Sequence, residues 1–523
     1  MEQEKKLTYV DLLADASIHA GYEDGLEQVR SWLGLTHPLL IGTEEVFSRP
    51  EFEARSPIDR RIHVGTFQTA TPARIREAIV VADKGFPAWQ ERNYGERAAI
   101  IRKTADLLDQ EKFLLAALIT YECGKNRTEA VAEVFEAIDL LRHHAEVFEK
   151  NGGYVIPARP EHPGDICRSV MRPYGVFAVI SPFNFPLSLA TGMAGAALIT
   201  GNAVILKPTS LTPLSVLRLC QAFRKAGVPP GAAQYLTGPG REFGEIVTAS
   251  QDVAGIAFTG SRDAGMILHR TFAAKQRYPK PIITEMGSKN PVIVTEHADL
   301  AKAVEGIARS AFGFSGQKCS AASRVYVHER VAGPFVAMLR DRTIGMSSGD
   351  PREKDTSISP LIDERAVQVF TASVVLARKD GGTIVCGGSV LSGGIFSLGH
   401  YVQPTIVTGL TRRHPLARKE LFVPFLIVET FSSLAEAIDE ANSTDFGLTA
   451  GIFSENEEEI ALFFSRIRSG VTYANRSGGA TTGAWPGTQA FCGWKASGST
   501  GRGVGGPFYL LSYMREQAQM QVR

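Results

Sequence analysis

Short apolar runs alternate with amphipathic stretches through the middle of the chain, and this alternation constrains the fold more than any other feature. VFAVIS (residues 176–181) and AVILKP (203–208) are typical of buried strands, and an amphipathic helix that ends at Gly227 and Pro229 follows the second run. The further runs AAQYLTG, AGIAFTG, PIITEMG and PVIVTE are also typical of strands. Buried strands alternating with helices predict a parallel, doubly wound α/β sheet.

The flanking regions extend this pattern. Residues 71–149 are predicted to form three long helices, one of them including GERAAIIRKTADLLDQEKFLLAALITYECGK. After residue 319 the alternation restarts with RVYVHE, a helix, a piece containing FVPFLIVETF and the helix SLAEAIDEANS, which predicts a second α/β unit. The final segment FYLLSYMREQAQMQVR alternates like an exposed strand that could pair with another subunit.

Length and charge exclude several classes of protein. At 523 residues the chain is too long for one small core. Its 56 basic and 55 acidic residues give a net charge of +1, which argues against nucleic acid or an anionic membrane as the main partner. Residues 173–206 carry no charge and are long enough to span a bilayer, but Pro182, Pro186 and several glycines interrupt them. We therefore expect a buried core there and no membrane partner.

The cysteines indicate the compartment. Six cysteines lie far apart without a CxxC pair, so they give no support for a metal knuckle, and no metal is expected. So few cysteines in a long chain are typical of free thiols in a reducing compartment. The opening residues MEQEKKLTYVDLLADAS contain no apolar run of the kind that a secretory signal requires. Together these features predict a cytoplasmic protein.

Cys319 is the most informative single residue. It lies in the segment GFSGQKCSAASR, where a glycine-containing run could form a turn that presents sulfur to a ligand. The neighbouring Lys318 and local N–H groups are expected to favour the thiolate, the reactive form of cysteine. The alternative is an inert, buried cysteine that behaves as a small hydrophobic residue. The motifs upstream of Cys319 decide between the two interpretations.

Two of these motifs follow apolar strands. Asn184 in SPFNFP could donate hydrogen bonds to negative charge that develops on an oxygen, although an asparagine that caps a turn would have the same neighbours. Lys207 in ILKP stands at a strand end, where ligands bind in α/β sheets, and could hold ribose hydroxyls or phosphate. A solvated lysine at a strand end is the alternative.

Two more motifs follow. In FTGSRDAG a strand ends at Gly260 and Ser261 opens a helix, an arrangement suited to a pyrophosphate, although it is not the G-x-G-x-x-G fingerprint. In ITEMGSKNP a carboxylate, Glu285, ends a strand. An apolar setting would raise its pKa towards neutrality, as a general base requires. An exposed glutamate at a strand end is the alternative.

Taken in order, these motifs resemble one family. The order is Asn184, Lys207, Gly260, Ser261, Glu285, Cys319 and the run Glu420-Leu421-Phe422. It resembles the aldehyde dehydrogenase superfamily, and the similarity extends from about Leu40 to the C-terminus. Within the superfamily the chain is most similar to the 1-pyrroline-5-carboxylate dehydrogenases, which oxidise glutamate γ-semialdehyde to glutamate. GFSGQKCSAASR, YECGKN with EAIDLL, and NRSGGATTGAWPGTQAFCGWKASGS carry this second resemblance.

The resemblance implies a fold and a set of domains. It implies an α/β protein with two doubly wound domains and a small β flap for oligomerisation. Residues 1–157 and 178–285 would form the cofactor domain with an N-terminal arm, residues 286–495 the catalytic domain, and residues 158–177 and 496–523 the oligomerisation segment. A homodimer or a higher homo-oligomer is expected.

The resemblance also implies chemical roles for three residues. Cys319 would attack the aldehyde carbon and form a thiohemiacetal and then a thioester. Asn184 and the backbone N–H of Cys319 would stabilise the oxyanion, and Glu285 would activate the hydrolytic water. NAD is the expected cofactor, with NADP as an alternative. The residues implied in cofactor binding are Ile180, Ser181, Pro182, Phe183, Lys207, Ser210, Gly260, Ser261, Gly287, Glu420 and Phe422.

The implied substrate site involves a further set of residues. The backbone of Gly483 and Ala484 would bind the α-carboxylate, and Phe185 and Phe491 would flank the aliphatic chain. Glu136 would pair with the ammonium group, unless it is simply a solvated helix glutamate. Ser320, beside the nucleophile, would also contribute. The implied substrate-binding set is Glu136, Phe185, Ser320, Gly483, Ala484 and Phe491.

Several positions depart from the family pattern. Ser210 stands where many relatives have a glutamate, which weakens discrimination against NADP. Ser288, Val423 and Cys492 stand where glycine is usual, and the loop between residues 475 and 482 is longer. Two alternatives therefore remain beside glutamate semialdehyde oxidation. One is oxidation of another aldehyde or semialdehyde, and the other is a catalytically silent relative.

Overall fold

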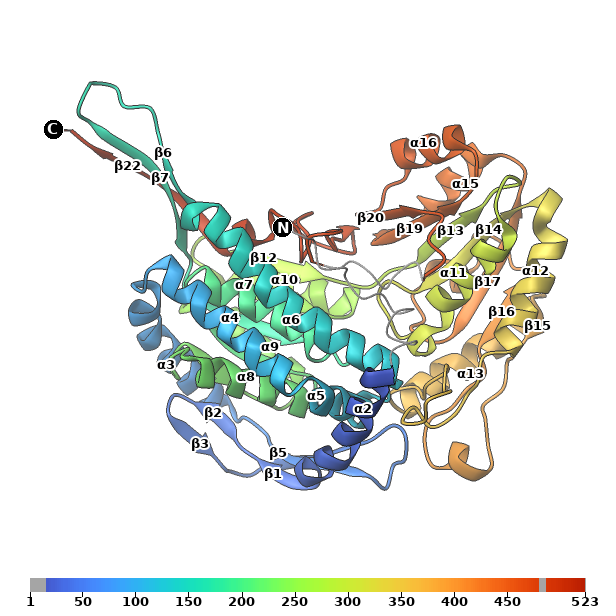
Figure 1. The fold of residues 1–523 in the computed structure, drawn as a ribbon, viewed down its shortest axis with the longest axis horizontal. Coiled ribbons are helices and arrows are strands. Elements are labelled where there is room, and N and C mark those ends of the chain that lie inside the picture. Colours follow the sequence, from blue (N-terminus) through green and yellow to red (C-terminus); the bar gives the residue numbers. More distant parts are fainter. Residues whose placement is uncertain (1–15, 479–485, 523) are drawn as a thin grey trace.

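The computed structural model describes residues 16–478 and 486–522. Figure 1 shows two α/β units side by side, with a narrow β flap projecting from the first unit. The first unit carries most of the blue to green part of the chain and the red C-terminal segment, and the second carries the yellow to orange-red part. This arrangement confirms the expected fold of two doubly wound domains with a small flap.

The first unit is built on a seven-stranded sheet with strand order β12-β11-β8-β9-β10-β2-β3. The strands from β12 to β10 are parallel, and β2 and β3 extend the sheet in antiparallel fashion. In chain order the strands are β2 (Leu39–Ile41), β3 (Glu44–Val46), β8 (Val176–Ser181), β9 (Ala203–Pro208), β10 (Ala233–Tyr235), β11 (Val253–Thr259) and β12 (Ile282–Glu285). Each parallel strand lies within a run that the sequence predicts as a strand, except that β11 begins one residue earlier than its run.

The helices of the first unit form more than one layer. α7 packs on β8 and β9, and α4 and α6 pack on α7. The helices are α2 (Ala16–Val29), α3 (Pro72–Gln90), α4 (Tyr94–Gln110), α5 (Lys112–Cys123), α6 (Arg127–Lys150), α7 (Ser188–Ile199), α8 (Pro213–Ala226), α9 (Gly240–Ala249) and α10 (Arg262–Lys275). The uncharged stretch 173–206 contributes β8, α7 and β9. In the described ranges, no helix is both long and apolar enough to cross a membrane.

One predicted helix is divided in two. The sequence predicts a continuous helix through residues 95–125, but the backbone leaves helical geometry at Glu111 (φ −107°, ψ 15°). The physical reason is burial: α4 buries one face, whereas almost all of α5 from Leu115 to Cys123 is buried between α2, α6 and α8. A straight extension of α4 could not reach that position, so residues 72–150 form four helices instead of three.

The second unit repeats the plan with a sheet of order β15-β16-β17-β14-β13-β19-β20, parallel except for β15. Its strands are β13 (Asn290–Val294), β14 (Ala322–His328), β15 (Thr383–Cys386), β16 (Thr405–Thr408), β17 (Phe425–Phe431), β19 (Thr449–Phe453) and β20 (Val471–Ala474). Its main helices are α11 (Leu300–Phe312), α12 (Glu329–Ile344), α13 (Glu364–Lys379), α15 (Leu434–Ala441) and α16 (Glu457–Arg466). The chain therefore crosses from the first sheet to the second within residues 286–289.

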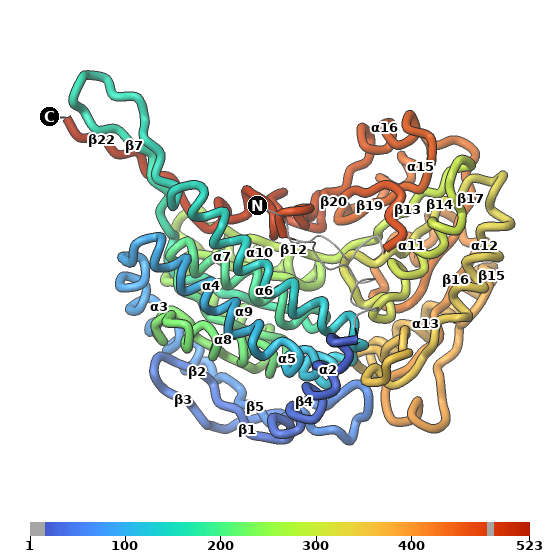
Figure 2. Tube along the Cα trace, viewed as in Figure 1, coloured from blue at the N-terminus to red at the C-terminus, as the bar shows by residue number. Residues whose placement is uncertain are grey.

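The flap joins segments that are distant in sequence. Its strand order is β22-β7-β6, with β6 (Val155–Pro157), β7 (Ile166–Pro173) and β22 (Met514–Gln521). The tail, for which the sequence suggests pairing with another subunit, pairs with β7 of its own chain and forms one edge of this sheet, as the red and teal segments of Figure 2 show. The flap also begins before residue 158, since β6 pairs with β7. Residues near 497 lie against the first unit, where Met286 N–H donates to the carbonyl of Ser497 at 2.8 Å.

Two small sheets complete the described structure. β1 (Leu35–His37), β4 (Glu51–Arg55) and β5 (His63–Gln68) form a three-stranded sheet below the first unit in Figure 1. β18 (Phe446–Gly447) pairs with β21 (Trp494–Lys495). This second pair brings the residues after the undescribed segment 479–485 back onto the second unit.

Candidate active site

Parallel strand ends bring the predicted residues of the first unit together. Ser181 lies opposite Pro208 in the β8–β9 pair, and Thr259 lies opposite Glu285 in the β11–β12 pair. The residues that follow these strands therefore share one edge of the sheet, the edge at which α/β proteins bind ligands. Asn184, after β8, is buried at this edge.

Glu285 ends β12 in a buried environment. Its backbone carbonyl accepts from Gly260 N–H at 3.1 Å, and its Oε2 accepts from Gly493 N–H at 3.1 Å. Burial raises the pKa of the Glu285 carboxyl well above its usual value, and the single backbone N–H opposes this only in part. The direction of this shift is the one that a general base requires.

The loop before Cys319 has an unusual backbone. Phe314 (φ 46°), Ser315 (φ 52°) and Gly316 (φ 70°) are all left-handed, which turns the chain sharply after α11. A Cβ on Gly316 would lie 2.6 Å from the carbonyl oxygen of Val423, so only glycine fits there. Gln317 fixes the loop, because its amide donates to the carbonyl of Pro360 at 3.1 Å. The turn leaves the Cys319 side chain partly exposed.

The strand that enters the second sheet holds the nucleophile loop. The Asn290 amide donates to the carbonyls of Cys319 at 2.8 Å and Ala321 at 2.9 Å, and the hydroxyl of Ser288 also donates to the Cys319 carbonyl. The sequence pointed to Ser288 only as a replacement for glycine and gave Asn290 no role. The one available signal was a run of small polar residues immediately before a predicted buried strand.

The charges around Cys319 differ from the prediction. Burial raises the pKa of the Cys319 thiol to about 12, and the carboxylates of Glu420, Glu285 and Glu136 raise it further by repulsion. Lys318 Nζ lies 2.8 Å from Glu129 Oε1, where both side chains are buried. The expectation that Lys318 favours the thiolate is therefore wrong, because its ammonium group neutralises a carboxylate of α6. In the unliganded protein the thiol is protonated at neutral pH.

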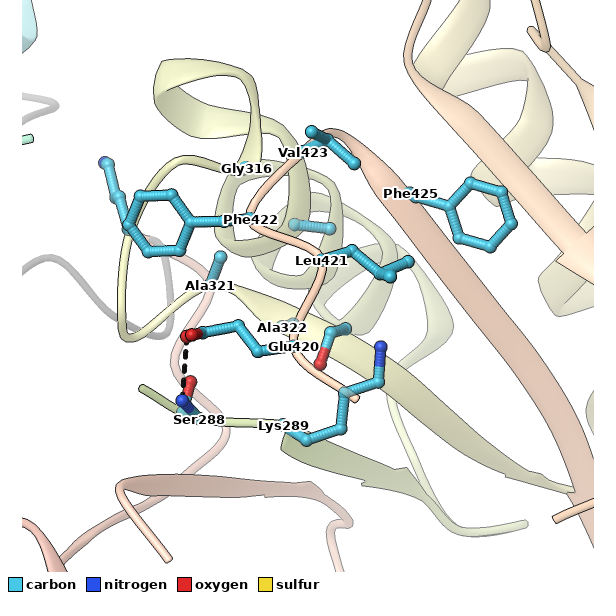
Figure 3. Close-up of a pocket in the computed structure, with 13 residues that line it drawn as sticks. Ser288, Lys289, Gly316, Ala321, Ala322, Glu420, Leu421, Phe422, Val423 and Phe425 are labelled. Carbon is cyan, nitrogen blue, oxygen red and sulfur yellow. Dashed lines mark hydrogen bonds between the residues drawn. The ribbon is translucent and has the colours of Figure 1, made fainter. Parts of the chain in front are cut away.

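The second unit contributes Glu420 and Phe422. Figure 3 shows Glu420 pointing towards the backbone of Ser288, whose N–H donates to Oε1 at 2.8 Å beside a cavity of about 20 Å³. A Cβ on Gly287 would lie 2.2 Å from Glu420 Oε2, so glycine allows this close approach. Phe422 packs edge-on against Phe183 of the first unit, with ring centroids 5.8 Å apart. Two predicted cofactor residues from different units thus meet.

Glu420, which is partly exposed, and the adjacent buried Lys289 are both ionisable groups with shifted pKa values. Burial raises the pKa of Glu420 to about 7, opposed by the Ser288 N–H and by attraction to Lys289. Burial also lowers the pKa of Lys289 to about 7. Within the described residues the Lys289 ammonium group has no hydrogen-bond partner. Both groups can therefore exchange protons near neutral pH.

A further group of predicted residues lies along β8, β9 and β11. Lys207 Nζ donates to the carbonyl of Pro208 at 2.9 Å, and burial lowers its pKa to about 8. Ser210 Oγ lies 3.5 Å from the carbonyl of Gly238. Ser261 caps α10 by accepting from Ala264 N–H at 3.3 Å, as the sequence predicts for a residue that opens a helix.

Glu136 lies on α6 and is partly exposed. Burial raises its pKa to about 7, Glu133 raises it further, and Lys125 and Lys318 lower it. Glu136 acts on Cys319 by repulsion, which places the predicted ammonium site near the nucleophile. The alternative of a fully solvated helix glutamate does not fit this burial.

Sequence reasoning missed a buried ion pair beneath α6. Lys125 Nζ lies 2.6 Å from Glu133 Oε2 with both side chains fully buried, and 3.2 Å from the centroid of the Phe185 ring. Glu133 Oε1 also accepts from the backbone N–H groups of Leu187, at 2.8 Å, and Ser188, at 3.2 Å. A charged residue on the apolar face of a predicted helix was the available signal.

The remaining predicted substrate residues differ in how well they are placed. Phe491 is fixed by its N–H bond to the Val504 carbonyl at 3.0 Å, and Ser320 is buried beside the nucleophile. Cys492 is buried and its thiol lies 3.3 Å from the carbonyl of Gly470. Gly483 and Ala484 lie outside the described residues.

Of the three residues that replace a usual glycine, Val423 packs in the core of the second unit, and Ser288 forms a hydrogen bond to the nucleophile loop.

Comparisons with known proteins agree with this geometry. A model of the aldehyde dehydrogenase family matches residues 46–518. The chain is 35% identical over 515 residues to a protein named 1-pyrroline-5-carboxylate dehydrogenase 1 from Halalkalibacterium halodurans, covering 97% of both chains. It resembles the solved structure of 1-pyrroline-5-carboxylate dehydrogenase from Thermus with bound NAD (TM-score 0.93, 30% identity, 100% of both chains).

A solved structure of a longer protein gives a similar match. Proline utilization A from Bdellovibrio bacteriovorus has a TM-score of 0.91 and 33% identity over 96% of this chain. The match covers 51% of that protein, so this chain spans about half of its length. The extent of the family match and the identity to curated relatives lead to one conclusion: the chain belongs to the aldehyde dehydrogenase family.

Proposed function

We propose that the protein oxidises L-glutamate γ-semialdehyde, which forms from 1-pyrroline-5-carboxylate, to L-glutamate in proline catabolism, with NAD or NADP as oxidant. The observation that carries this proposal is that the carboxyl of Glu285, at the end of the first sheet, acts by repulsion on the partly exposed thiol of Cys319 in the second unit. The pKa of Glu285 is raised, and the buried amide of Asn184 follows a strand that ends at the same edge of the first sheet. The relatives named 1-pyrroline-5-carboxylate dehydrogenase support the choice of substrate.

The residues present fit a nicotinamide dinucleotide. Lys207 is a buried cation whose ammonium group bonds a backbone carbonyl, and the buried hydroxyl of Ser181 has no hydrogen-bond partner among the described residues. Such donors suit ribose hydroxyls and phosphate oxygens. Ser261 at the start of α10 would meet the pyrophosphate, Glu420 would hold the nicotinamide ribose, and Phe422 would pack beside the ring. When bound, the nicotinamide accepts the hydride that leaves the former aldehyde carbon.

The chain's own groups perform the other steps. The Cys319 thiol passes its proton to Glu285, and the sulfur bonds to the aldehyde carbon. Asn184 and the Cys319 N–H donate to the resulting oxyanion. Glu285 releases the thiol proton to solvent before deacylation. After oxidation to the thioester, Glu285 takes a proton from water, the water oxygen bonds to the acyl carbon, the carbon–sulfur bond breaks, and Glu285 returns this proton to the sulfur. The products are the carboxylic acid and the free cysteine.

Glu136 would select the substrate by charge. A carboxylate in this position attracts the ammonium group of an amino-acid aldehyde and gives no advantage to aldehydes without one. Phe185 and Phe491 would flank the aliphatic chain, Ser320 would lie beside the nucleophile, and Gly483 and Ala484 would bind the α-carboxylate. The site would thus recognise the charges of the substrate as well as its aldehyde.

Steady-state kinetics with three aldehydes test the substrate. We expect kcat/KM to be highest for glutamate semialdehyde, compared with succinate semialdehyde and a simple aliphatic aldehyde. Glu136→Gln should lower kcat/KM for glutamate semialdehyde by roughly 10- to 100-fold and leave that for succinate semialdehyde within about twofold. A higher value for another aldehyde would contradict the substrate but not the reaction. Absence of turnover with all three aldehydes would favour a catalytically silent relative.

We also propose that the protein is a cytoplasmic homo-oligomer. The six free cysteines suit a reducing compartment. The flap carries exposed apolar side chains, including Val155 and Ile156 on β6 and Met520 on β22, and such exposure is typical of a contact surface. Light scattering should give a mass of at least two chains. Ile156→Lys should lower that mass, and an unchanged mass would place the contact elsewhere.

A further inference from the structure

Ser288 bonds to Glu420 through its backbone and to Cys319 and Asn290 through its side chain. Its backbone N–H donates to Glu420 Oε1 at 2.8 Å, as the dashed line in Figure 3 shows. Its hydroxyl donates to the carbonyl of Cys319 and accepts from Asn290 Nδ2 at 2.8 Å. The residue is buried, so these bonds do not compete with solvent.

We propose that Ser288 is a positioning residue that couples the ribose-binding carboxylate, Glu420, to the peptide of the nucleophile. In this arrangement, binding at the nicotinamide end of the cofactor site changes the orientation and reactivity of Cys319 through Ser288. The inference rests on the proposed function, in which Glu420 holds the nicotinamide ribose.

Close packing makes the first half of this coupling direct. A Cβ on Gly287 would overlap the Glu420 carboxylate, so the carboxylate lies directly on the 287–288 backbone. A ligand that pulls Glu420 towards its ribose must therefore shift this backbone or break the bond from Ser288 N–H. Packed interiors transmit such shifts because they contain little free volume.

The second half of the coupling runs through a single carbonyl. The Cys319 carbonyl accepts from both Ser288 Oγ and Asn290 Nδ2, and two donors restrict its orientation more than one donor would. The carbonyl and the thiol side chain branch from the same Cα. A shift of the carbonyl that moves this Cα therefore also moves the sulfur and the Cys319 N–H.

A purely structural role explains the Ser288 hydroxyl less well. Asn290 already satisfies the carbonyls of Cys319 and Ala321, at 2.8 and 2.9 Å, and its own Oδ1 accepts from Thr449 N–H at 3.0 Å. The loop would therefore keep its buried bonds without the serine hydroxyl. What Ser288 adds is the connection between this carbonyl and Glu420.

The test measures the thiol and turnover in the full-length protein. Cys319 is alkylated with iodoacetamide with and without saturating NAD, and its peptide is quantified by mass spectrometry, with Cys167 and Cys386 as internal standards. In the wild type we expect NAD to change the alkylation rate of Cys319. In Ser288→Ala and Ser288→Gly this change should shrink at least about threefold, kcat should fall about 3- to 30-fold, and KM for NAD should stay within about twofold.

Ser323→Ala is the matched control. Ser323 lines the same cavity, and its hydroxyl contacts the carbonyl of Asn290 at 3.5 Å without bonding either Glu420 or Cys319. We expect this variant to keep the wild-type response to NAD. Thermal unfolding of all three variants separates a change in coupling from a loss of stability, because a structural role alone would lower Tm and leave the response to NAD intact.

The outcomes distinguish the two proposals. If the wild type oxidises aldehydes and its alkylation rate responds to NAD, but both Ser288 variants respond as strongly, the coupling is overturned and the proposed function stands. If the wild type turns over aldehyde without any NAD effect on Cys319, the coupling is likewise overturned. If the wild type shows neither turnover nor a response to NAD, both proposals fail.

Discussion

The buried ionisable groups beneath α6 and those around Cys319 contrast sharply. Beneath α6, Lys125 pairs with Glu133 at 2.6 Å and Lys318 pairs with Glu129 at 2.8 Å. Around the nucleophile, Glu285 and Glu420 accept hydrogen bonds from backbone N–H groups. Across residues 16–478 and 486–522, no basic side chain lies within ion-pair distance of these two carboxylates.

The difference separates structural from chemical carboxylates. A buried carboxylate with a cation beside it stays ionised and holds its partner in place, and removing either member leaves an uncompensated charge. A buried carboxylate without a cation has a raised pKa, so it can gain and lose a proton near neutral pH. The fold thus keeps its proton-transfer groups apart from the ion pairs that hold the site together.

The largest expected effect follows loss of the thiol. Cys319→Ala should lower kcat for aldehyde oxidation by at least about 10⁴-fold, because no other group can form the thioester. The measurement is the absorbance of reduced cofactor, and Cys386→Ala serves as a control with unchanged activity. Substantial turnover by the Cys319 variant would show that a different group is the nucleophile.

Removing the unpaired acid should be the next most severe change. Glu285→Gln keeps the shape but cannot accept a proton, so kcat should fall by about 10² to 10⁴-fold. Deacylation should suffer most, so mass spectrometry of the enzyme after mixing with aldehyde and NAD should detect an acyl adduct on Cys319. Wild-type turnover would mean that another group activates the water.

The two kinds of carboxylate should differ in their effect on stability. Glu133→Gln leaves the Lys125 ammonium group buried without its counter-charge and should lower the free energy of unfolding by about 3–5 kcal/mol. Glu420→Gln removes a carboxylate that forms no ion pair with the nearby Lys289 in the described structure, and it should cost less than about 1 kcal/mol. Denaturant unfolding measures both, and equal losses would remove the distinction between the two regions.

The pH dependence of thiol reactivity gives a smaller but direct test. Because the pKa of Cys319 is raised to about 12, the thiolate fraction grows throughout the range from neutral to mildly alkaline pH. Alkylation without cofactor should therefore accelerate about tenfold per pH unit, with no plateau below the pKa. A plateau near neutral pH would restore the view that a cation activates the thiol.

The smallest effect is expected from adding a carboxylate near Lys207. Ser210→Glu would place a carboxylate near Lys207, for which the described structure has no ion-pair partner. A carboxylate there repels the 2′-phosphate of NADP, so the ratio of kcat/KM for NAD over NADP should rise about tenfold. Ser210→Ala is the control for the loss of the hydroxyl, and an unchanged ratio in Ser210→Glu would place the 2′-position elsewhere.

The sequence predicted the positions of the residues that lie at the ends of parallel strands. Parallel strands meet at one edge, so the order of Lys207, Gly260 and Glu285 along the chain was enough to bring them together. It did not predict the break at Glu111, because that break follows from burial of α5 between three other helices. It misplaced the Lys318 charge, because the direction of that side chain depends on the left-handed turn at Phe314 and on a carboxylate far away in sequence, Glu129.

The hydrogen bonds of the Asn202 side chain have a consequence for folding during synthesis on the ribosome. Its side chain accepts from the N–H groups of Tyr174, at 2.8 Å, and Gly175, at 3.0 Å, and donates to the carbonyl of Tyr513 at 2.9 Å, 311 residues later. At ordinary translation rates that separation takes roughly 15–60 s to synthesise. Throughout this interval the nascent first unit lacks Tyr513, which packs on Phe177. Until Tyr513 is synthesised, the emerging chain therefore exposes an apolar surface that a chaperone can recognise.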